Sequence, residues 1–297
     1  MLINYENIVK YYVKAHIPSL FNLYNDYKKN KYKKRVAKTI TEREAFYERN
    51  GSYPLFNTIE IETHNRCNST CSFCPVNKND DTREYKKMSI ELFTSIIQQL
   101  QHLEYRGTVG LYSNNEPLLD ERLVDLARIA KQHLPNATIQ IYTNGTLLTV
   151  DKFVDLMQYL DHMYIDNYND KLKLITPVQA VHDHCAKNKI YLDKVRIRLR
   201  KLHDVLSTRG GQAPNRKSEQ IESLDVSCLL PFRQMIVRPD GKVSFCCNDA
   251  LGKHTLGDLA VQSIEEVWNG EIYTSIRKNI IQSRSLLPLC KGCDSLL

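Results

Sequence analysis

The chain has 297 residues, of which 42% are apolar and 25% are charged, and its formal net charge is +7 at pH 7. This length supplies enough chain for one barrel-sized domain and a small additional one. Its sequence contains no run near the ~18 apolar residues of a membrane helix, residues 1–10 lack the apolar core of a signal peptide, and so mild a charge does not indicate nucleic acid. Of the nine cysteines, the clustered ones are therefore interpreted as metal ligands in a reducing cytoplasm rather than as disulfides.

Residues 1–54 are expected to form a basic helical extension. Much of the excess charge lies here, and residues 28–35 (KKNKYKKR) are its most basic stretch. One interpretation docks the segment on an anionic partner such as nucleic acid or a membrane surface. Because its aromatic residues do not repeat in a base-stacking pattern, we favour a helix that packs on the remainder of the chain with a solvated basic face.

Residues 56–63 (FNTIEIET) alternate apolar and polar side chains, which predicts a β-strand. Cys67, Cys71 and Cys74 follow directly with C-x3-C-x2-C spacing. Three thiolates can bind three irons of a [4Fe-4S] cube and leave the fourth iron open to an outside ligand. Zinc or a redox pair is the alternative, with His64 as the nearest candidate for a fourth zinc ligand in an awkward position at a strand end.

The middle of the chain alternates predicted strands with predicted helices. The strands are predicted at residues 108–112, 137–142, 162–166 and 195–199. The helices are predicted at residues 90–100, 123–130, 150–160 and 177–187, with Ser89 and Asp120 as N-caps of the first two. This alternation predicts a parallel barrel or open barrel with its site at the carboxyl ends of the strands. Five strands are counted, and residues 201–226 are too short and glycine-rich to assign another unit.

Polar segments follow the predicted strands, where a barrel would carry its site. They are residues 113–117 (SNNEP), 143–145 (TNG) and 166–168 (DNY), and the fifth strand alternates Arg196, Arg198 and Arg200 with apolar residues. Any one of these segments also occurs in ordinary turns or at a solvated barrel edge. Their order behind the cysteine triplet makes them candidates for one site.

A second cysteine group lies near the C-terminus. Cys228, Cys246, Cys290 and Cys293 supply four thiolates, enough to close every corner of a second cube, with zinc as the alternative. Cys247 competes with Cys246 for one of these positions. Residues 235–238 and 242–245 flank Pro239-Asp240-Gly241 and predict a hairpin, and one helix is predicted from Ser263 to Ile280. Cys185 has no partner at motif spacing and is expected to be a packed thiol.

The run Cys67-Asn-Ser-Thr-Cys71-Ser-Phe73-Cys74 resembles the cluster motif of the radical S-adenosylmethionine (SAM) superfamily. The C-terminal cysteine order resembles the twitch domain, a short form of the SPASM domain with one auxiliary cluster. The resemblance implies an α/β fold, with a partial (β/α) barrel of five or six parallel strands at residues 55–222. It also implies a small C-terminal α+β iron-sulfur domain at residues 223–297, behind the helical extension at residues 1–54.

Cofactors and partners follow from the same resemblance. It implies SAM and two [4Fe-4S] clusters, with an external one-electron donor such as flavodoxin or ferredoxin. It implies a small-molecule substrate, with no nucleic acid and no membrane span, and a cytoplasmic location.

The resemblance also assigns roles to residues at matching positions. Cys67, Cys71 and Cys74 would bind the first cluster beside Phe73, and Cys228, Cys246, Cys290 and Cys293 would bind the auxiliary one. Glu116 would contact the SAM amino group; Asn114 and Asn115 replace the two glycines usual before it, and asparagine tolerates positive φ. Thr143 and Asn144 would reach the ribose, and Arg198 is the candidate for the SAM carboxylate. Arg209, in residues 207–211 (STRGG), would contact the substrate between the clusters through its forked donors; a flexible linker is the alternative there.

The resemblance implies a radical SAM oxidoreductase that oxidises a secondary alcohol of a sugar, cyclitol or sugar-derived metabolite to a ketone. The auxiliary cluster would accept the remaining electron. The cysteine spacing is similar to that of the 2-deoxy-scyllo-inosamine dehydrogenases, a cyclitol-oxidising branch. Two alternatives stay open: a radical SAM maturase that crosslinks or activates a peptide or protein, and a non-catalytic metal-binding interaction module.

Overall fold

The computed structural model describes residues 2–296, which build one nine-stranded sheet in the order β1-β6-β5-β4-β3-β2-β7-β8-β9. The strands are β1 (Leu2–Asn4), β2 (Thr58–Ile61), β3 (Thr108–Gly110), β4 (Thr138–Thr143), β5 (His162–Tyr168), β6 (Val195–Arg200), β7 (Gln234–Val237), β8 (Lys242–Ser244) and β9 (Thr255–Asp258). All neighbours from β1 to β7 pair in parallel, whereas β7, β8 and β9 pair antiparallel.

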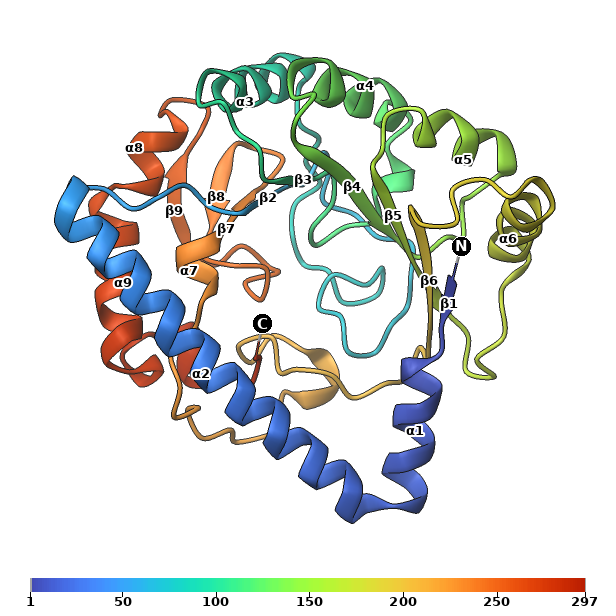
Figure 1. The fold of residues 1–297 in the computed structure, drawn as a ribbon, viewed down its shortest axis with the longest axis horizontal. Coiled ribbons are helices and arrows are strands. Elements are labelled where there is room, and N and C mark those ends of the chain that lie inside the picture. The colour runs from blue at the N-terminus through green and yellow to red at the C-terminus, as the bar shows by residue number, and fades with distance from the viewer. Residues whose placement is uncertain (1, 297) are drawn as a thin grey trace.

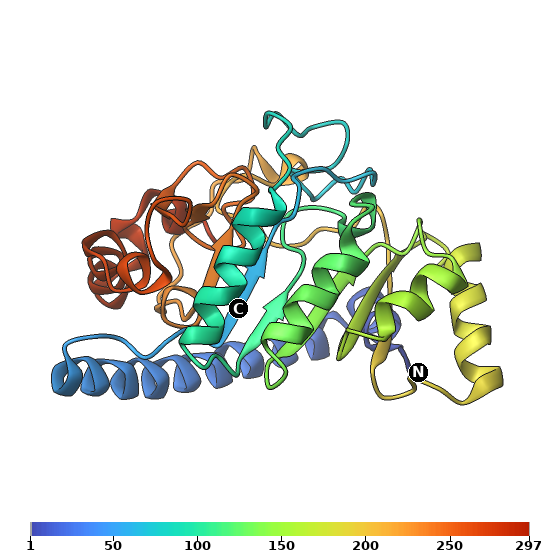
Figure 2. The same ribbon diagram turned by 90° about the horizontal axis from the view of Figure 1, so that it is seen from above.

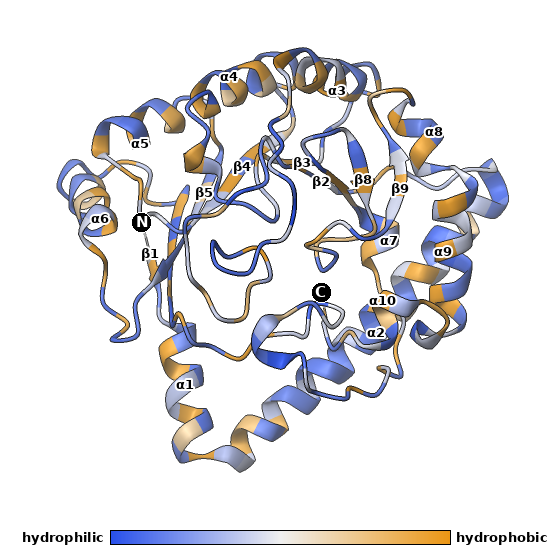
Figure 3. Cartoon of the chain, turned by 180° about the vertical axis from the view of Figure 1, so that it is seen from behind, coloured by the Kyte–Doolittle hydropathy of each residue, from blue (hydrophilic) through white to orange (hydrophobic). Residues whose placement is uncertain are grey.

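Helices cover the outer face of the curved sheet (Figure 1). The helices are α1 (Glu6–His16), α2 (Pro18–Asn50), α3 (Ile90–His102), α4 (Leu123–His133), α5 (Val150–Met157), α6 (Thr176–Asn188), α7 (Leu230–Arg233), α8 (Ile264–Trp268), α9 (Glu271–Gln282) and α10 (Pro288–Lys291). Figure 3 shows hydrophobic residues along the central strands and a largely hydrophilic α2. None of the helices within residues 2–296 is both long and apolar enough to cross a membrane.

The two faces of the central strands have different surroundings: one packs under the outer helices and the other lines the inside of the barrel. Burial alternates residue by residue along β4 and β5. Ile139 and Ile141 of β4 belong to the core under the outer helices, whereas Tyr142 lines a cavity inside the barrel. This period of two follows from the pleat of a strand, and it delivers polar side chains to the inner face.

The α/β parallel fold predicted from the sequence is confirmed. The five predicted strands are β2 to β6, and the hairpin around Gly241 is β7 and β8. β7 is the sixth parallel strand, on the other side of β2 from β3, and β1 adds a further parallel strand beside β6. β1 and β9 were not predicted, because residues 2–4 lie in the segment expected to be helical and residues 255–258 (TLGD) include Gly and Asp, which are depleted in strands.

Two details of the sequence analysis are wrong. Ser89 caps α3 by accepting a hydrogen bond from the Leu92 amide at 3.0 Å, but Asp120 does not cap α4. Its carboxylate instead accepts bonds from the Arg122 backbone and guanidinium. The single helix predicted from Ser263 to Ile280 is two helices, because Gly270 takes an extended conformation (φ −65°, ψ 164°) between α8 and α9.

The sheet runs through all three predicted segments of the chain. β1 and α1 precede residue 54, and β7 follows residue 222, yet both strands pair with strands of the barrel. The boundaries at residues 54 and 222 therefore remain predictions. Figure 2 shows α2 running along one end of the sheet, with the loop that follows β2 at the opposite end.

Candidate active site

Cys67, Cys71 and Cys74 line one cavity of about 230 Å³ past the carboxyl ends of the strands. Asn77 shapes their loop, because its amide donates to the Cys74 carbonyl at 2.7 Å and its oxygen accepts from the Asn79 amide at 2.9 Å. The Ser69 amide donates to the Cys67 sulfur at 3.4 Å. A loop without regular structure thereby holds three thiols toward the same space.

His64 does not join these thiols. Its Nε2 donates to the Glu116 carbonyl at 3.0 Å, and its Nδ1 accepts from the Arg66 amide at 3.1 Å. Both ring nitrogens are occupied, so this side chain supplies no fourth ligand for zinc. The cysteine loop therefore offers three ligands, which fits a cube with one open iron.

Burial raises the pKa of Cys67 to about 12 and that of Cys71 to about 11. Thiols in such surroundings become thiolate ligands only when a cationic centre binds them. The donor set of three buried thiols fits an iron-sulfur cluster. Within residues 2–296, no three Cys, His, Asp or Glu side chains are placed to hold a single metal ion. A cube does not need such convergence, because each thiolate binds a different iron.

Glu116 joins the turns that follow β3 and β4. Its carboxylate accepts from the Thr143 hydroxyl at 2.6 Å, the Asn144 amide at 2.7 Å and the Leu118 amide at 3.1 Å. The Asn144 side chain in turn donates to Asn68 in the cysteine loop at 2.8 Å. The cysteine loop and two of the predicted polar segments, residues 113–117 and 143–145, are thus connected by hydrogen bonds at one end of the barrel.

Asn114 and Asn115 form their turn without the glycine conformation, since neither has a positive φ. The Asn114 amide donates to Glu62 at 2.7 Å, and the Asn115 oxygen accepts from the Ser113 amide at 3.0 Å. The Asn115 side-chain nitrogen is buried at the cavity and has no partner among the described residues. A buried donor left unpaired costs stability, so a polar ligand is the natural partner.

Arg198 lies behind the cavity wall rather than in it. Its Nη2 donates to Asp166 at 2.9 Å, and its guanidinium lies over the Tyr142 ring at 4.8 Å. Asp166 and Tyr142 line the cavity, but Arg198 is not among its lining residues. In this structure the Arg198 charge is already matched by Asp166.

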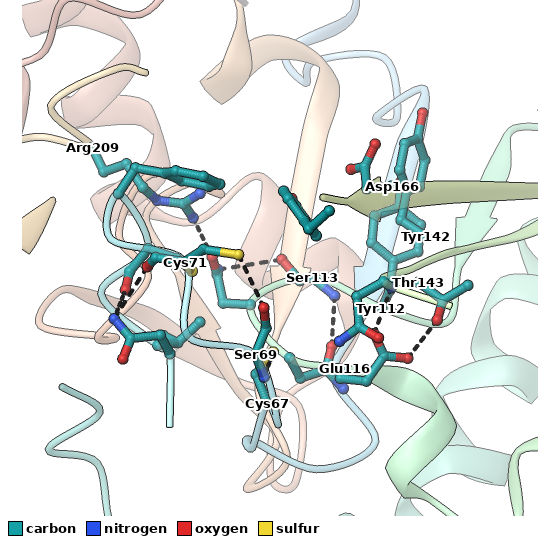
Figure 4. Close-up of a pocket in the computed structure, with 18 residues that line it drawn as sticks. Cys67, Ser69, Cys71, Tyr112, Ser113, Glu116, Tyr142, Thr143, Asp166 and Arg209 are labelled. Carbon is teal, nitrogen blue, oxygen red and sulfur yellow. Dashed lines mark hydrogen bonds between the residues drawn. The ribbon is translucent and has the colours of Figure 1, made fainter. Parts of the chain in front are cut away.

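Arg209 lies across the cavity from Glu116 and Thr143 (Figure 4). Its Nη2 donates to the Cys247 carbonyl at 2.7 Å and to the side chain of Asn114. The preceding Thr208 hydroxyl donates to the Gly292 carbonyl at 2.6 Å, inside the Cys290–Cys293 knuckle. Arg209 thus connects the second cysteine group to the cavity that holds the first.

The second cysteine group is also brought together. Cys246, Cys290 and Cys293 are buried, and Cys228 is half-buried. Burial, together with the neighbouring thiols Cys228 and Cys293, raises the pKa of Cys290 to about 12. Arg284 donates to the Val226 carbonyl at 2.7 Å and to the Ser295 carbonyl at 2.9 Å, which ties the segments around Cys228 and Cys293 together.

Comparisons with known proteins identify the family. The sequence model of the radical SAM superfamily matches residues 61–209, and that of SPASM, an iron-sulfur cluster-binding domain, matches residues 228–294. The S-adenosyl-L-methionine-dependent 2-deoxy-scyllo-inosamine dehydrogenase of Niallia circulans is 30% identical over 247 residues, 82% of this chain and 94% of that protein. This chain belongs to the radical SAM superfamily.

Solved structures agree with this assignment. The crystal structure of BtrN in complex with AdoMet and 2-DOIA is similar with a TM-score of 0.70 and 28% identity, over 82% of this chain and 94% of that one. The structure of anSMEcpe with bound AdoMet has a TM-score of 0.51 and 15% identity, over 82% of this chain and 89% of that one, and shows the shared fold alone. The chain is thus a radical SAM enzyme with SAM, a [4Fe-4S] cluster and an auxiliary iron-sulfur domain.

The radical SAM cavity gathers most of the predicted site residues. Those on its wall are Cys67, Phe73, Cys71, Cys74, Asn114, Asn115, Glu116, Thr143, Asn144 and Arg209. Tyr112 and Tyr142 also line it, and the sequence analysis missed them. Their rings lie 4.6 Å apart, and Tyr164 stacks on Tyr142 at 4.4 Å. The signal was present, because a tyrosine ends or follows each of three neighbouring predicted strands.

Glu60 is a third residue that the sequence analysis missed. It lies on β2 and is 7% exposed. Its carboxylate accepts from the Ser113 hydroxyl at 2.6 Å and from the Gln234 amide at 2.8 Å. Burial raises its pKa to about 7. Its signal was a glutamate at a strand position that alternates with buried isoleucines, next to a predicted site.

Cys246 and Cys247 are adjacent in the chain, but different charged groups act on their thiols. Burial raises the pKa of both Cys246 and Cys247, but the charges next in importance differ. For Cys246 they are other thiols, whereas for Cys247 they are Glu60 and Arg209. Cys228 and Cys293 act on both thiols, and Cys247 in addition lies beside Glu60 and Arg209, toward the radical SAM cavity.

Proposed function

We propose that this radical SAM enzyme oxidises a secondary alcohol of an aminocyclitol, or of a related cyclitol or sugar, to a ketone. The observation that carries the proposal is Arg209, which lines the cavity beside three thiols and bonds to the backbone of the second thiol group. Polar groups suited to a hydroxyl compound, Ser113 and Asn115, lie on the same wall. The 30% identity to an enzyme named as a dehydrogenase of 2-deoxy-scyllo-inosamine favours this reaction over peptide modification.

Cys67, Cys71 and Cys74 would hold the first cluster, and Cys228, Cys246, Cys290 and Cys293 the auxiliary one. When bound, SAM and the two clusters supply a hydrogen-abstracting radical and an acceptor for one electron. Glu116, Thr143, Asn144 and Asn115 would orient SAM against the cysteine loop. Arg198 would act through Asp166, whose carboxylate lies on the cavity wall.

The residues of this chain account for the hydroxyl proton. An alcohol that becomes a ketone loses a hydrogen atom from carbon, a proton from oxygen and one electron. Ser113 lies on the cavity wall and donates to Glu60 behind it. Because burial raises the pKa of Glu60 to about 7, this carboxylate can take a proton through Ser113 near neutral pH. Arg209 would hold the hydroxyl group in place with its forked donors.

The external electron source and the location are part of the same proposal. Flavodoxin or ferredoxin would supply the electron that starts each turnover. A cluster with an open iron needs a reducing compartment, so we propose the cytoplasm.

The test is anaerobic reconstitution followed by reaction with SAM, dithionite and a panel of cyclitols that starts with 2-deoxy-scyllo-inosamine. We expect one equivalent each of 5′-deoxyadenosine and ketone by mass spectrometry, and both should be lost in Cys67→Ala. Cys185→Ala is the matched control, because Cys185 lies on α6, is buried in the hydrophobic core and belongs to neither thiol group. Formation of 5′-deoxyadenosine without ketone from any alcohol, or a mass change only on peptides, would contradict the proposal.

A further inference from the structure

The middle of α2 carries a stripe of positive charge and tyrosine. We call it the α2 basic stripe; it comprises Tyr24, Tyr27, Lys28, Lys31, Lys34, Arg35 and Lys38. Spacings of three and four residues place these side chains on one helix face, and all are exposed. Of its five cations, Lys38 alone pairs with a carboxylate among the described residues, that of Glu42 at 3.9 Å.

The extension holds most of the charge imbalance of the enzyme. Residues 1–54 contain 11 Lys and Arg residues against five Asp and Glu residues, which is six of the seven net positive charges. No acidic residue occurs between Asp26 and Glu42. A concentrated field of one sign steers partners of the opposite sign, so the chemistry that this surface fits is anionic.

The face of α2 next to the stripe packs beside the auxiliary thiols, and Tyr32 of that face carries the Arg35 guanidinium over its ring. Tyr32 and Val36 are buried against Leu229, which directly follows Cys228, and Leu296 packs on the same cluster. Leu296 lies three residues after Cys293. The basic stripe therefore lies within about one helix diameter, roughly 10 Å, of the auxiliary site.

We propose that the α2 basic stripe is the docking surface for an acidic one-electron redox protein that exchanges electrons with the auxiliary site. This proposal rests on the proposed function, in which each alcohol oxidised leaves one electron at that site. In the exchange the auxiliary site is oxidised by one electron and the partner is reduced by one electron. No bond forms or breaks, and the hydroxyl proton has already left through Ser113 and Glu60.

Position and composition favour a redox protein over a nucleic acid or a membrane. α2 lies along the end of the sheet opposite the cysteine loop (Figure 2), so a docked protein leaves the mouth of the radical SAM cavity open. Tyr24 and Tyr27 are 48% and 63% exposed and give the stripe apolar contacts among its charges. Small interfaces of this kind are typical of transient electron-transfer partners. A nucleic acid or a lipid surface does not exchange electrons with the auxiliary site, so the position of the stripe beside these thiols favours a redox protein.

The extension lies outside the residues that the superfamily model matches. The superfamily model begins at residue 61, and the curated relative matches 82% of this chain but 94% of its own length. A docking element outside the matched core can be altered without touching the residues that bind SAM. This separation makes the proposal testable in the active holoenzyme.

The test compares two triple charge reversals in the reconstituted, dithionite-reduced holoenzyme after excess reductant is removed. The first is Lys28→Glu/Lys31→Glu/Lys34→Glu in the stripe. The matched control is Lys171→Glu/Lys173→Glu/Lys187→Glu, three exposed lysines before and within α6, outside the stripe. Each protein is mixed anaerobically with an oxidised acidic flavodoxin, and the appearance of its semiquinone is followed by stopped flow at low and high salt.

We expect the stripe variant to reduce flavodoxin at least about 10-fold more slowly at low salt, because steering by opposite charges is lost. The wild-type rate should fall as salt rises, and the control should stay within about twofold of wild type. The variant Lys28→Gln/Lys31→Gln/Lys34→Gln should be intermediate. Replacing Cys67, Cys71 and Cys74 with Ala leaves the auxiliary site alone, and the salt-dependent rate should persist.

Equal rates in the stripe variant and wild type, or equal slowing in both triple variants, would overturn the proposal. So would a stripe variant that loses binding to RNA or to phosphatidylglycerol vesicles while its reaction with flavodoxin is unchanged. Ketone formation driven by dithionite should be the same in all charge variants, since none of these lysines lies in the cavity. Absence of ketone in the wild-type enzyme would instead count against the proposed function.

Discussion

Two buried glutamates, Glu60 on β2 and Glu62 directly after it, show how single residues set the chemistry of the cavity. Glu60 and Glu62 are both buried, but their partners differ. Glu62 accepts from the Asn114 amide and pairs with Arg83 at 3.3 Å, so its charge is matched. Among residues 2–296, the donors within hydrogen-bond distance of Glu60 are both neutral, Ser113 and Gln234. Burial without a paired charge raises a carboxyl pKa, which suits Glu60 to carry a proton rather than a permanent charge.

Replacing Glu60 with Gln tests this role. A base must be deprotonated, so ketone formation in the wild type is expected to rise with pH through about 7, the pKa of Glu60, and then level off. In Glu60→Gln the rate should fall by about 10²–10⁴-fold and lose this dependence. The measurement is the rate of ketone formation between pH 5.5 and 9, with exposed Glu265→Gln as the control.

Urea unfolding of Glu60→Gln distinguishes the loss of a catalytic base from misfolding of the variant. The pKa of Glu60 is higher in the folded chain than in the unfolded one, so its protonated form favours folding. Its contribution is therefore lost as the pH rises through 7, and Glu60→Gln should unfold at the same or a higher urea concentration at pH 8. An unchanged pH profile in Glu60→Gln would assign the proton to another group.

The turns that follow the strands decide the site at the scale of elements. The turn after β4 needs Gly145, whose φ is +74°. A Cβ there would lie 2.6 Å from a Val178 methyl and 2.9 Å from an Ile165 methyl. The neighbouring Thr143 and Asn144 bond to Glu116, so the position of this turn is transmitted to the cavity. Close packing against β5 and α6 therefore supports a site built from loops.

Gly145→Ala should lower the free energy of unfolding by about 2–4 kcal/mol. About 1 kcal/mol comes from the left-handed backbone, and the remainder from overpacking. Gly51→Ala is the matched control, because Gly51 has a φ of +71° but nothing within 4 Å of the added Cβ. It should cost only about 1 kcal/mol. Urea unfolding of the two variants measures the difference, and equal losses would show that the contacts of Gly145 do not matter.

The whole molecule depends on buried arginines that join distant segments. Arg284 is 2% exposed and donates to carbonyls at Val226 and Ser295. It thereby holds the segment of Cys228 beside that of Cys293. Arg277 is fully buried and plays a similar part, with bonds to the carbonyls of Pro231 at 2.9 Å and Trp268 at 2.7 Å. Each guanidinium offers several donors in a fixed plane, which one ammonium group cannot replace.

Arg284→Lys should therefore loosen the auxiliary site as a unit. We expect a loss of about 3 kcal/mol in unfolding free energy and a fall from about eight irons per chain to about four after reconstitution. The surface replacement Arg128→Lys, where Arg128 pairs with its α4 neighbour Asp125 at 3.0 Å, should change neither quantity. Iron and sulfide analysis with urea unfolding measures both. Retention of all irons in Arg284→Lys would show that Arg284 does not support the second thiol group.

Some of this protein is determined by local sequence. The cysteine triplet, the alternation of strand and helix, and the Ser89 cap each depend on residues within a few positions of one another. Such features can be predicted because spacing and periodicity carry their physical cause. The same holds for the order of the polar segments after the strands, which placed five of the predicted residues on the cavity of the cysteine triplet.

The strand pairing and the surroundings of Glu60 and Arg198 could be recognised only in the folded chain. The pairing of β1 with β6 and of β7 with β2 joins residues far apart in sequence, and strands of three or four residues carry no local signal for a partner. Glu60 became a candidate base because Ser113 and Gln234 surround it, and Arg198 was turned to Asp166 by the register of β5 and β6. Burial and charge pairing are properties of neighbours in space. The sequence therefore predicted the cofactors, whereas the proposals for Glu60 as a base and for α2 as a docking surface needed the fold.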